Sequence, residues 1–284
     1  MILLTGATGK TGGETARQLA AAGIPFRALV RNPDKANELR ELGADLVIGD
    51  IGATDVLRKA FDGVDKALLV LPNVEEQLTL EKQFTDEAVR AGVKHLVYLS
   101  SLESVPESTN PITQNHVAAE NYIRDSGLTY TLVRPTFFMQ IFEASAPRIK
   151  ATGKITMPAG SGTVSCTDLR DVAAVIVKIF TETGHENQSY DLTGPELLTF
   201  GEIAEKFSTV LGRPVEYVDQ PMEEFKNVLR SINMSDWRTE AVGLEFVAIA
   251  NGAIDHTTDK IEELLGRPPT SLEQFISDKR ELFA

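Results

Sequence analysis

The chain has 284 residues, 42% of them hydrophobic, and carries a formal net charge of −13 at pH 7. Length and apolar content suffice for one large domain, or one domain with a smaller lobe, built around a substantial core. The acidic balance would repel phosphate backbones and anionic lipid, so nucleic acid and membrane surfaces are excluded as expected partners.

Cysteine usage and the N-terminal residues indicate the compartment. Cys166 is the only cysteine and cannot form an internal disulfide, which fits a reducing compartment. The first residues, MILLTGATGK, lack the basic segment and the long apolar run of a signal peptide. We therefore expect a cytoplasmic protein without a membrane-spanning segment.

Apolar runs and helical segments alternate over the first half of the chain. We predict strands at Met1–Thr5, Phe26–Val30, Leu46–Ile48, Lys66–Leu71, His95–Ser100 and Thr129–Val133. The helices between them are predicted at Glu14–Ala22, Asp34–Leu42, Thr54–Phe61 with Thr54 as its N-cap, Val74–Ala91 and Gln114–Ser126. Fully apolar strands alternating with helices are typical of a parallel sheet covered on both faces, so the predicted fold class is α/β with a Rossmann-type, doubly wound sheet.

The alternation becomes less regular after Pro135. Gly153–Thr163 is rich in Gly, Pro, Ser and Thr and is predicted to be a loop. A helix at Leu169–Thr181, capped by Asp168 and Asp171, leads to a strand at Ser189–Leu192 that returns to the sheet. Further helices are predicted at Phe200–Leu211, Met222–Ile232, Thr239–Asn251 and Leu272–Leu282, with a short element at Pro214–Val218. We expect a Rossmann domain over residues 1–150 and a smaller, mainly helical lobe over residues 151–284, interleaved with the last sheet elements.

A glycine-rich turn, TGATGKTG, joins the first predicted strand to the first predicted helix. Glycine allows a tight turn and a close approach to a pyrophosphate, which the helix N-terminus attracts through its amide groups and dipole. The alternative is a glycine-rich turn without a ligand, and the strand-to-helix context weighs against it. The expected pyrophosphate-binding residues are Gly6, Thr8, Gly9, Lys10, Thr11 and Gly12.

The end of the second strand indicates which dinucleotide binds. An NAD site would carry Asp or Glu there to hold the ribose hydroxyls, but the chain has Arg31, followed by Lys35. A guanidinium fits the 2′-phosphate of NADP, so we predict NADP(H) as cofactor. The alternative is a solvated arginine at a strand end.

Other strand ends are expected to line the same groove, because ligands bind at the carboxyl edge of such sheets. Asp50 and Ile51 are placed to flank the adenine, although Asp50 is equally well explained as a loop-capping residue. The remaining predicted cofactor contacts are Leu71, Pro72, Asn73, Ser100, Pro135, Thr136, Phe137 and Phe138.

Several of these segments together resemble a known family. The glycine turn, Arg31 in LVRNPDK, the Gly49–Asp50 pair and SGLTYTLVRPTFF resemble the atypical short-chain dehydrogenase/reductases of the NmrA-like group. Within that group the likeness is greatest to quinone, triphenylmethane-dye and azo-dye reductases. The resemblance implies an NADP(H)-binding domain and a smaller lobe with a substrate cleft between them. It leaves two roles open: hydride transfer to an acceptor, or redox sensing without turnover.

The segment QNHVAAENY lies where typical short-chain dehydrogenases carry a Tyr/Lys pair four residues apart. Here His116 and Glu120 have that spacing, and Tyr122 is followed four residues later by Ser126. Alcohol–ketone interconversion, which needs a positioned acid, is therefore disfavoured. Electron-poor quinones and dyes depend mostly on orientation against the nicotinamide. His116, with a pKa expected near working pH, is the candidate catalytic donor; the alternative is a helix-surface histidine that pairs with Glu120.

Aromatic residues supply candidates for the acceptor site. Phe138, Phe142 and Trp237 are the predicted substrate contacts, with core packing as the competing interpretation for each. No histidine or cysteine has metal-ligand spacing, so no metal is predicted. The sequence thus predicts an NADPH-dependent oxidoreductase that passes a hydride to a quinone-like or dye-like aromatic acceptor without the Tyr/Lys pair. The alternative is a non-catalytic NADP(H)-binding redox sensor, and a homodimer is compatible with either.

Overall fold

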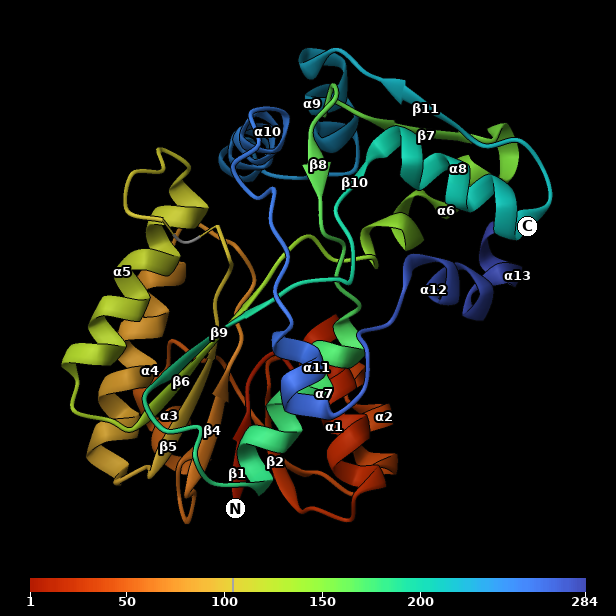
Figure 1. The fold of residues 1–284 in the computed structure, drawn as a ribbon. Coiled ribbons are helices and arrows are strands. Elements are labelled where there is room, and N and C mark those ends of the chain that lie inside the picture. The colour runs from red at the N-terminus through yellow and green to blue at the C-terminus, as the bar shows by residue number, and fades with distance from the viewer. Residues whose placement is uncertain (104) are drawn as a thin grey trace. The chain divides into compact units, whose positions relative to one another are not determined.

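The computed structural model describes residues 1–103 and 105–284, which form two compact units (Figure 1). The first unit comprises Met1–Arg134 and Val172–Tyr190, and the second comprises Pro135–Asp171 and Asp191–Ala284. Within the described ranges, no helix combines the length and the apolar character that crossing a bilayer requires.

A seven-stranded sheet in the order β3-β2-β1-β4-β5-β6-β9 forms the centre of the first unit. Strands β1 to β6 pair in parallel, and β9 lies beside β6. Because parallel strands end at the same edge, the loops that follow them converge there, and the order reverses between β1 and β4. The predicted doubly wound α/β fold is confirmed. The strand bounds are β1 Ile2–Leu4, β2 Phe26–Val30, β3 Asp45–Ile48, β4 Lys66–Leu69, β5 His95–Leu99, β6 Tyr130–Pro135 and β9 Gln188–Leu192.

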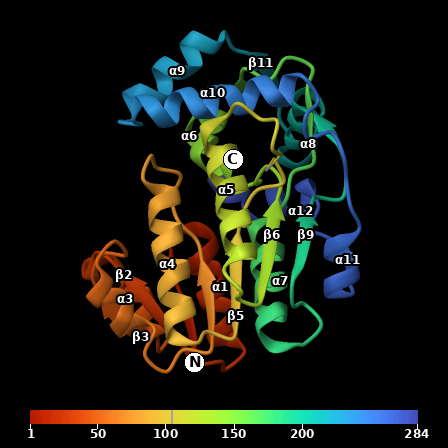
Figure 2. The same ribbon diagram turned by 90° about the vertical axis from the view of Figure 1, so that its left-hand side faces the viewer.

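Helices cover both faces of this sheet (Figures 1 and 2). On one face lie α3 (Thr54–Ala60), α4 (Gln77–Ala91) and α5 (Pro111–Asp125), and on the other lie α1 (Lys10–Ala21) and α7 (Leu169–Thr181). The first face buries Phe61 and Phe84, whose ring centroids are 4.8 Å apart, against apolar strand residues. Such burial removes the apolar face of each helix from water and fixes the helices on the sheet.

Several helix starts differ from the predicted ones. Helix α5 begins at Pro111 because the side chain of Asn110 caps it by accepting from the amide of Ile112, whereas we predicted a start at Gln114. Thr54 is the first residue of α3 rather than its N-cap. Helix α1 starts at residue 10 rather than 14, and α4 at residue 77 rather than 74. The single helix predicted over residues 34–42 is a 3₁₀ turn, η1 (Pro33–Lys35), followed by α2 (Asn37–Glu41).

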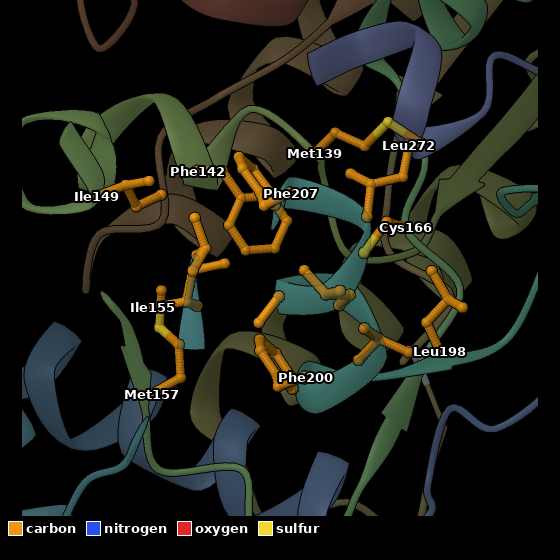
Figure 3. Packing of buried hydrophobic residues seen from close by; sticks show 14 of the residues in the cluster. Met139, Phe142, Ile149, Ile155, Met157, Cys166, Leu198, Phe200, Phe207 and Leu272 are labelled. Carbon is orange, nitrogen blue, oxygen red and sulfur yellow. The ribbon is translucent and has the colours of Figure 1, made fainter. Parts of the chain in front are cut away.

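The second unit is built mainly from helices around an aromatic core (Figure 3). Phe142 and Phe207 pack with centroids 5.4 Å apart, and Phe200 contributes to the same cluster. Strands β7 and β11 pair in parallel, and β8 and β10 pair antiparallel. The element bounds are α6 Ile141–Thr152, β7 Lys154–Met157, β8 Thr163–Val164, β10 Leu198–Thr199, α8 Phe200–Leu211, β11 Glu216–Asp219, α9 Met222–Ser231, α10 Asp236–Ala250, α11 Lys260–Leu265, α12 Leu272–Asp278 and α13 Arg280–Phe283.

Predictions for this unit were partly wrong. The segment predicted as loop over residues 153–163 contains all of β7, and α6 and α11 were not predicted. The predicted capping role of Asp168 is confirmed, since its Oδ1 accepts from the amide of Arg170 at 2.8 Å. Asp171 instead accepts from the guanidinium of Arg267 at 2.7 Å and the amide of Thr270 at 2.6 Å, and so anchors the C-terminal segment.

Candidate cofactor site

The glycine turn after β1 owes its shape to backbone contacts that exclude larger residues. Gly6 has φ +62°, and a Cβ on it would lie 2.8 Å from the carbonyl oxygen of Val70. A Cβ on Gly12 would lie 2.4 Å from the carbonyl oxygen of Gly6. The hydroxyl of Thr5 donates to that same Val70 oxygen at 3.0 Å and so fixes the turn against the end of β4. The turn therefore has the close helix–strand packing that dinucleotide-binding turns require.

Helix α1 starts at the predicted anion site. Its N-cap residue is Gly9, which has no side chain to cap the helix. Among the described residues, no capping side chain bonds to the amides at this positive end of the helix dipole. Thr8, Gly9 and Lys10 are exposed at this end, whereas Thr11 is 8% exposed. Of the two predicted hydroxyl donors, Thr8 is the accessible one.

Arg31 follows β2 at the same edge of the sheet. Its guanidinium is exposed, and neither Arg31 nor the exposed Lys35 makes a hydrogen bond or ion pair through its side chain to another described residue. Asn32 accepts from the amide of Asp34 at 2.9 Å, which starts the 3₁₀ turn and leaves Arg31 at the strand end. Two cations without carboxylate partners here are available to a phosphate group.

The loops after β3 and β4 combine structural and accessible groups. Asp50 accepts from the amide of Gly52 at 2.8 Å, so its loop-capping role is observed, and Ile51 packs partly against the core. After β4, Leu71 also packs against the core, while Pro72 is exposed and Asn73 is half-buried. Their contacts to the cofactor stay predictions.

The segment after β6 belongs to the second unit and is firmly fixed there. The amide of Thr136 donates to the carbonyl oxygen of Leu192 at 3.0 Å. The carbonyl oxygen of Phe137 accepts from the amide of Thr167 at 2.9 Å. Phe137 packs edge-on against Phe200, with centroids 5.8 Å apart. Pro135 is buried and Phe138 is half-buried, so Phe138 is the more accessible of the two.

The two other predicted acceptor contacts lie in different surroundings. Phe142 is fully buried in the core of the second unit, as the competing core interpretation anticipated (Figure 3). Trp237 is half-buried in the first turn of α10. Of the two, only Trp237 offers side-chain surface to a ligand in this conformation.

His116 is a buried residue, so the interpretation as a surface histidine is wrong. It is 6% exposed, and its Nδ1 lies 2.7 Å from the hydroxyl of Tyr98 on β5. Burial lowers the pKa of His116 to about 4, against a smaller opposing effect of Glu120. The expectation of a pKa near working pH is therefore corrected, since His116 is neutral there. Its part in catalysis stays a prediction.

Glu120 does not bond to His116 and has partners of its own. Its carboxylate accepts from the Ser100 hydroxyl at 2.6 Å and from Nε of Arg134 at 2.7 Å, with a second contact from the same guanidinium. Nη2 of Arg124 also donates to Oε2 of Glu120, at 3.0 Å. The side chain of Glu120 is 2% exposed, so it is a buried ion that links α5 to the carboxyl ends of β5 and β6.

Sequence reasoning missed a chain of buried polar residues beside His116. Gln77 and Glu81 on α4 are buried, and Glu81 accepts from the Tyr98 hydroxyl at 3.0 Å. Thr85 continues the same buried face of the helix, donating to the carbonyl oxygen of Glu81 at 2.8 Å. Polar residues at positions 77, 81 and 85 follow helical i, i+4 spacing on the face that also carries Phe84, and this pattern was the available signal.

Two other histidines are buried in the first unit and make hydrogen bonds there. His95 Nε2 lies 2.8 Å from the hydroxyl of Thr131, and His185 Nδ1 lies 2.9 Å from the hydroxyl of Tyr190. Among the residues that the structure describes, no three His, Cys, Asp or Glu side chains gather as a metal site would require. The absence of a metal cofactor stays a prediction.

Comparison with known proteins gives consistent matches over nearly the whole chain. The model of the NmrA-like family matches residues 1–276. The NAD(P)H azoreductase of Xenophilus azovorans is 36% identical over 277 residues, covering 97% of this chain and 96% of that protein. The triphenylmethane reductase of Citrobacter sp. complexed with NADP(H) has a TM-score of 0.87 and 30% identity, covering 98% of this chain and 99% of that one. Quinone oxidoreductase 2 of Escherichia coli complexed with NADPH has a TM-score of 0.88 and 28% identity, covering 99% of this chain and 100% of that one.

Proposed function

Because the chain belongs to the NmrA-like family, we propose that it binds NADPH at the glycine turn and Arg31 and reduces a quinone-like or dye-like aromatic acceptor. It is an NAD(P)H-dependent oxidoreductase, as its azoreductase and quinone oxidoreductase relatives are named. The observation that carries the cofactor assignment is the turn itself, where a Cβ on Gly12 would meet backbone at 2.4 Å. Only glycine permits this close packing of the helix start against the turn, which dinucleotide-binding turns require.

The chain's own groups would bind and orient the reactants. The start of α1 would hold the pyrophosphate, and Arg31 with Lys35 would hold the 2′-phosphate. NADPH, when bound, supplies the hydride. Ser100 and the loop after β4 lie at the same sheet edge and are proposed to line the nicotinamide half of the site.

The acceptor class follows from the missing acid–base pair. His116 is neutral and bonded to Tyr98, and Glu120 is an ion held by two arginines, so neither reproduces a Tyr/Lys proton relay. Reduction of a quinone, azo or triphenylmethane acceptor gives a delocalised or neutral product and depends mostly on orientation against the nicotinamide. Trp237 and Phe138, both half-buried, are the proposed aromatic contacts.

A steady-state assay tests this function. NADPH oxidation should be measured with a panel of quinones, azo dyes and triphenylmethane dyes, together with NADPH binding in the absence of acceptor. We expect turnover with at least one class above the background without enzyme. Tight binding that distinguishes NADPH from NADP⁺, without turnover of any acceptor, would instead support the redox-sensor alternative.

Arg31→Ala is expected to weaken NADPH binding about 10- to 100-fold and to leave NADH binding unchanged, because a charge-assisted bond to the 2′-phosphate contributes about 1.5–3 kcal/mol. The measurement is the dissociation constant of each cofactor for both proteins. Arg40→Ala is the matched control, since Arg40 is an exposed arginine of the same region whose guanidinium donates to Asn37. An equal loss for NADPH and NADH would show that Arg31 does not recognise the 2′-phosphate.

The setting proposed for this activity is the cytoplasm. The one cysteine of the chain, Cys166, is buried and unpaired, and burial raises its pKa to about 12. A free thiol in place of disulfides favours a reducing compartment.

A further inference from the structure

Helix α4 carries a buried carboxyl group that lacks one hydrogen-bond partner. Glu81 is 1% exposed, and its Oε1 accepts from Nε2 of Gln77 at 2.9 Å. Oε2 of Glu81 and Oε1 of Gln77 are both buried without a partner among the described residues. Burial without full solvation disfavours the ionised carboxyl and raises the pKa of Glu81 to about 7, although the bonds from Gln77 and Tyr98 oppose this effect. Glu81 thus takes up a proton near neutral pH.

The hydroxyl of Tyr98 connects this carboxyl group to His116. It lies 3.0 Å from Oε1 of Glu81 and 2.7 Å from Nδ1 of His116. A tyrosine hydroxyl carries one hydrogen, so it donates to one neighbour and accepts from the other. An ionised Glu81 only accepts. Tyr98 then donates to Glu81, His116 donates from Nδ1, and Nε2 of the neutral ring keeps its lone pair.

A proton on Glu81 reverses the direction of these bonds. Oε1 has the Tyr98 oxygen within reach as an acceptor, so the new O–H donates to Tyr98. One proton enters from solvent at Nε2 of His116, the Nδ1 proton passes to the Tyr98 oxygen, and the original Tyr98 hydroxyl proton passes to Oε1 of Glu81. The Tyr98 hydroxyl then donates to Nδ1, the charge of the ring is unchanged, and the net uptake is one proton, on Glu81. The low pKa of His116, about 4, keeps the ring neutral in both states.

The neighbouring charged groups are fixed by partners of their own. From α5, Glu120 faces Tyr98 and His116 but is neutralised by Arg134 of β6 and by Arg124. From α3, Arg58 is engaged with Glu87, further along α4. Glu81 is therefore the group of this cluster placed to titrate near pH 7.

We propose that Glu81 is a positioning residue whose protonation, transmitted through Tyr98, selects which ring nitrogen of His116 carries the hydrogen. With Glu81 protonated, His116 offers an N–H at Nε2. With Glu81 ionised, it offers a lone pair there. This hydrogen-bond chain does not depend on whether the proposed acceptors are reduced.

Nitrogen-15 NMR of protein labelled in its four histidines tests the proposal. The His116 signal is identified by its absence in His116→Gln. In the wild type we expect the Nε2–H tautomer at about pH 5.5 and the Nδ1–H tautomer at about pH 8.5, because the lower pH lies below and the higher above the Glu81 pKa of about 7. One tautomer at both pH values would overturn the proposal.

Variants show which group controls the change. Glu81→Gln cannot titrate, so we expect one tautomer of His116 at both pH values. Tyr98→Phe keeps the buried ring but removes the connecting hydroxyl, with the same expected result. Glu87→Gln is the matched control on the same helix and should retain the wild-type change. A Glu81→Gln protein that still changes tautomer near pH 7 would also overturn the proposal.

Discussion

Gly12→Ala is expected to weaken NADPH binding tenfold to hundredfold and to lower the free energy of unfolding by about 1–3 kcal/mol. The added Cβ would lie 2.4 Å from the carbonyl oxygen of Gly6, 2.6 Å from its carbonyl carbon and 2.9 Å from the amide nitrogen of Ala7. All three are backbone atoms, so no side-chain rotation relieves the contact. Either α1 moves away from the turn or the turn opens, and both displace the amide groups that face the pyrophosphate.

The measurements are the NADPH dissociation constant and urea unfolding of the same preparation. Gly201→Ala is the matched control, because Gly201 also lies in the first turn of a helix, α8, but its nearest neighbour would be 3.7 Å from the new Cβ. That change should leave binding unaltered and stabilise the protein slightly, since alanine favours helix. Wild-type NADPH affinity in Gly12→Ala would show that the turn does not bind the dinucleotide.

The fold was predictable because its signals are local and repeated. Most strands of the sheet are short, largely apolar runs, and each crossover helix ends near a glycine, as α4 does at Gly92. Starts of helices were less predictable because they depend on single capping contacts, such as Asn110 at α5. In the second unit, β7 pairs with β11 across some sixty residues of sequence, a register that composition alone does not reveal.

In the candidate cofactor site, too, the features set by local sequence were predictable, and those set by contacts between distant segments were not. The glycine turn and Arg31 are contiguous with the strands that position them, so their spacing carried the prediction. The surroundings of His116 depend on Tyr98 and Glu81, which come from two other elements, and nothing in their spacing along the chain indicates that they lie close together. The spacing of His116 and Glu120 indicates one pair, whereas His116 contacts Tyr98 and Glu120 contacts Ser100 and Arg134.

Glu120→Gln is expected to lower the free energy of unfolding by about 3–5 kcal/mol, which is the usual cost of removing one partner from a buried ion pair. The carboxylate is 2% exposed and receives both Arg134 and Arg124, together with the Ser100 hydroxyl. A neutral amide cannot compensate the positive charge of either guanidinium. Its NH2 group would also point a hydrogen-bond donor at the N–H and O–H donors of Arg134, Arg124 and Ser100. Since Ser100 and Arg134 lie at the ends of β5 and β6, the sheet edge that is proposed to bind NADPH loosens as well.

Urea unfolding of Glu120→Gln, Arg134→Met and the double variant measures this effect as a cycle. The double variant should be less destabilised than the sum of the single ones, because removing both charges avoids leaving one of them unpaired. Glu182→Gln is the matched control: Glu182 pairs with Lys178 at 2.7 Å on α7 but its side chain is 53% exposed, so a loss of no more than about 0.5 kcal/mol is expected. A similarly small loss in Glu120→Gln would mean that the buried carboxylate is dispensable, and that the two arginines find water or other acceptors at the sheet edge.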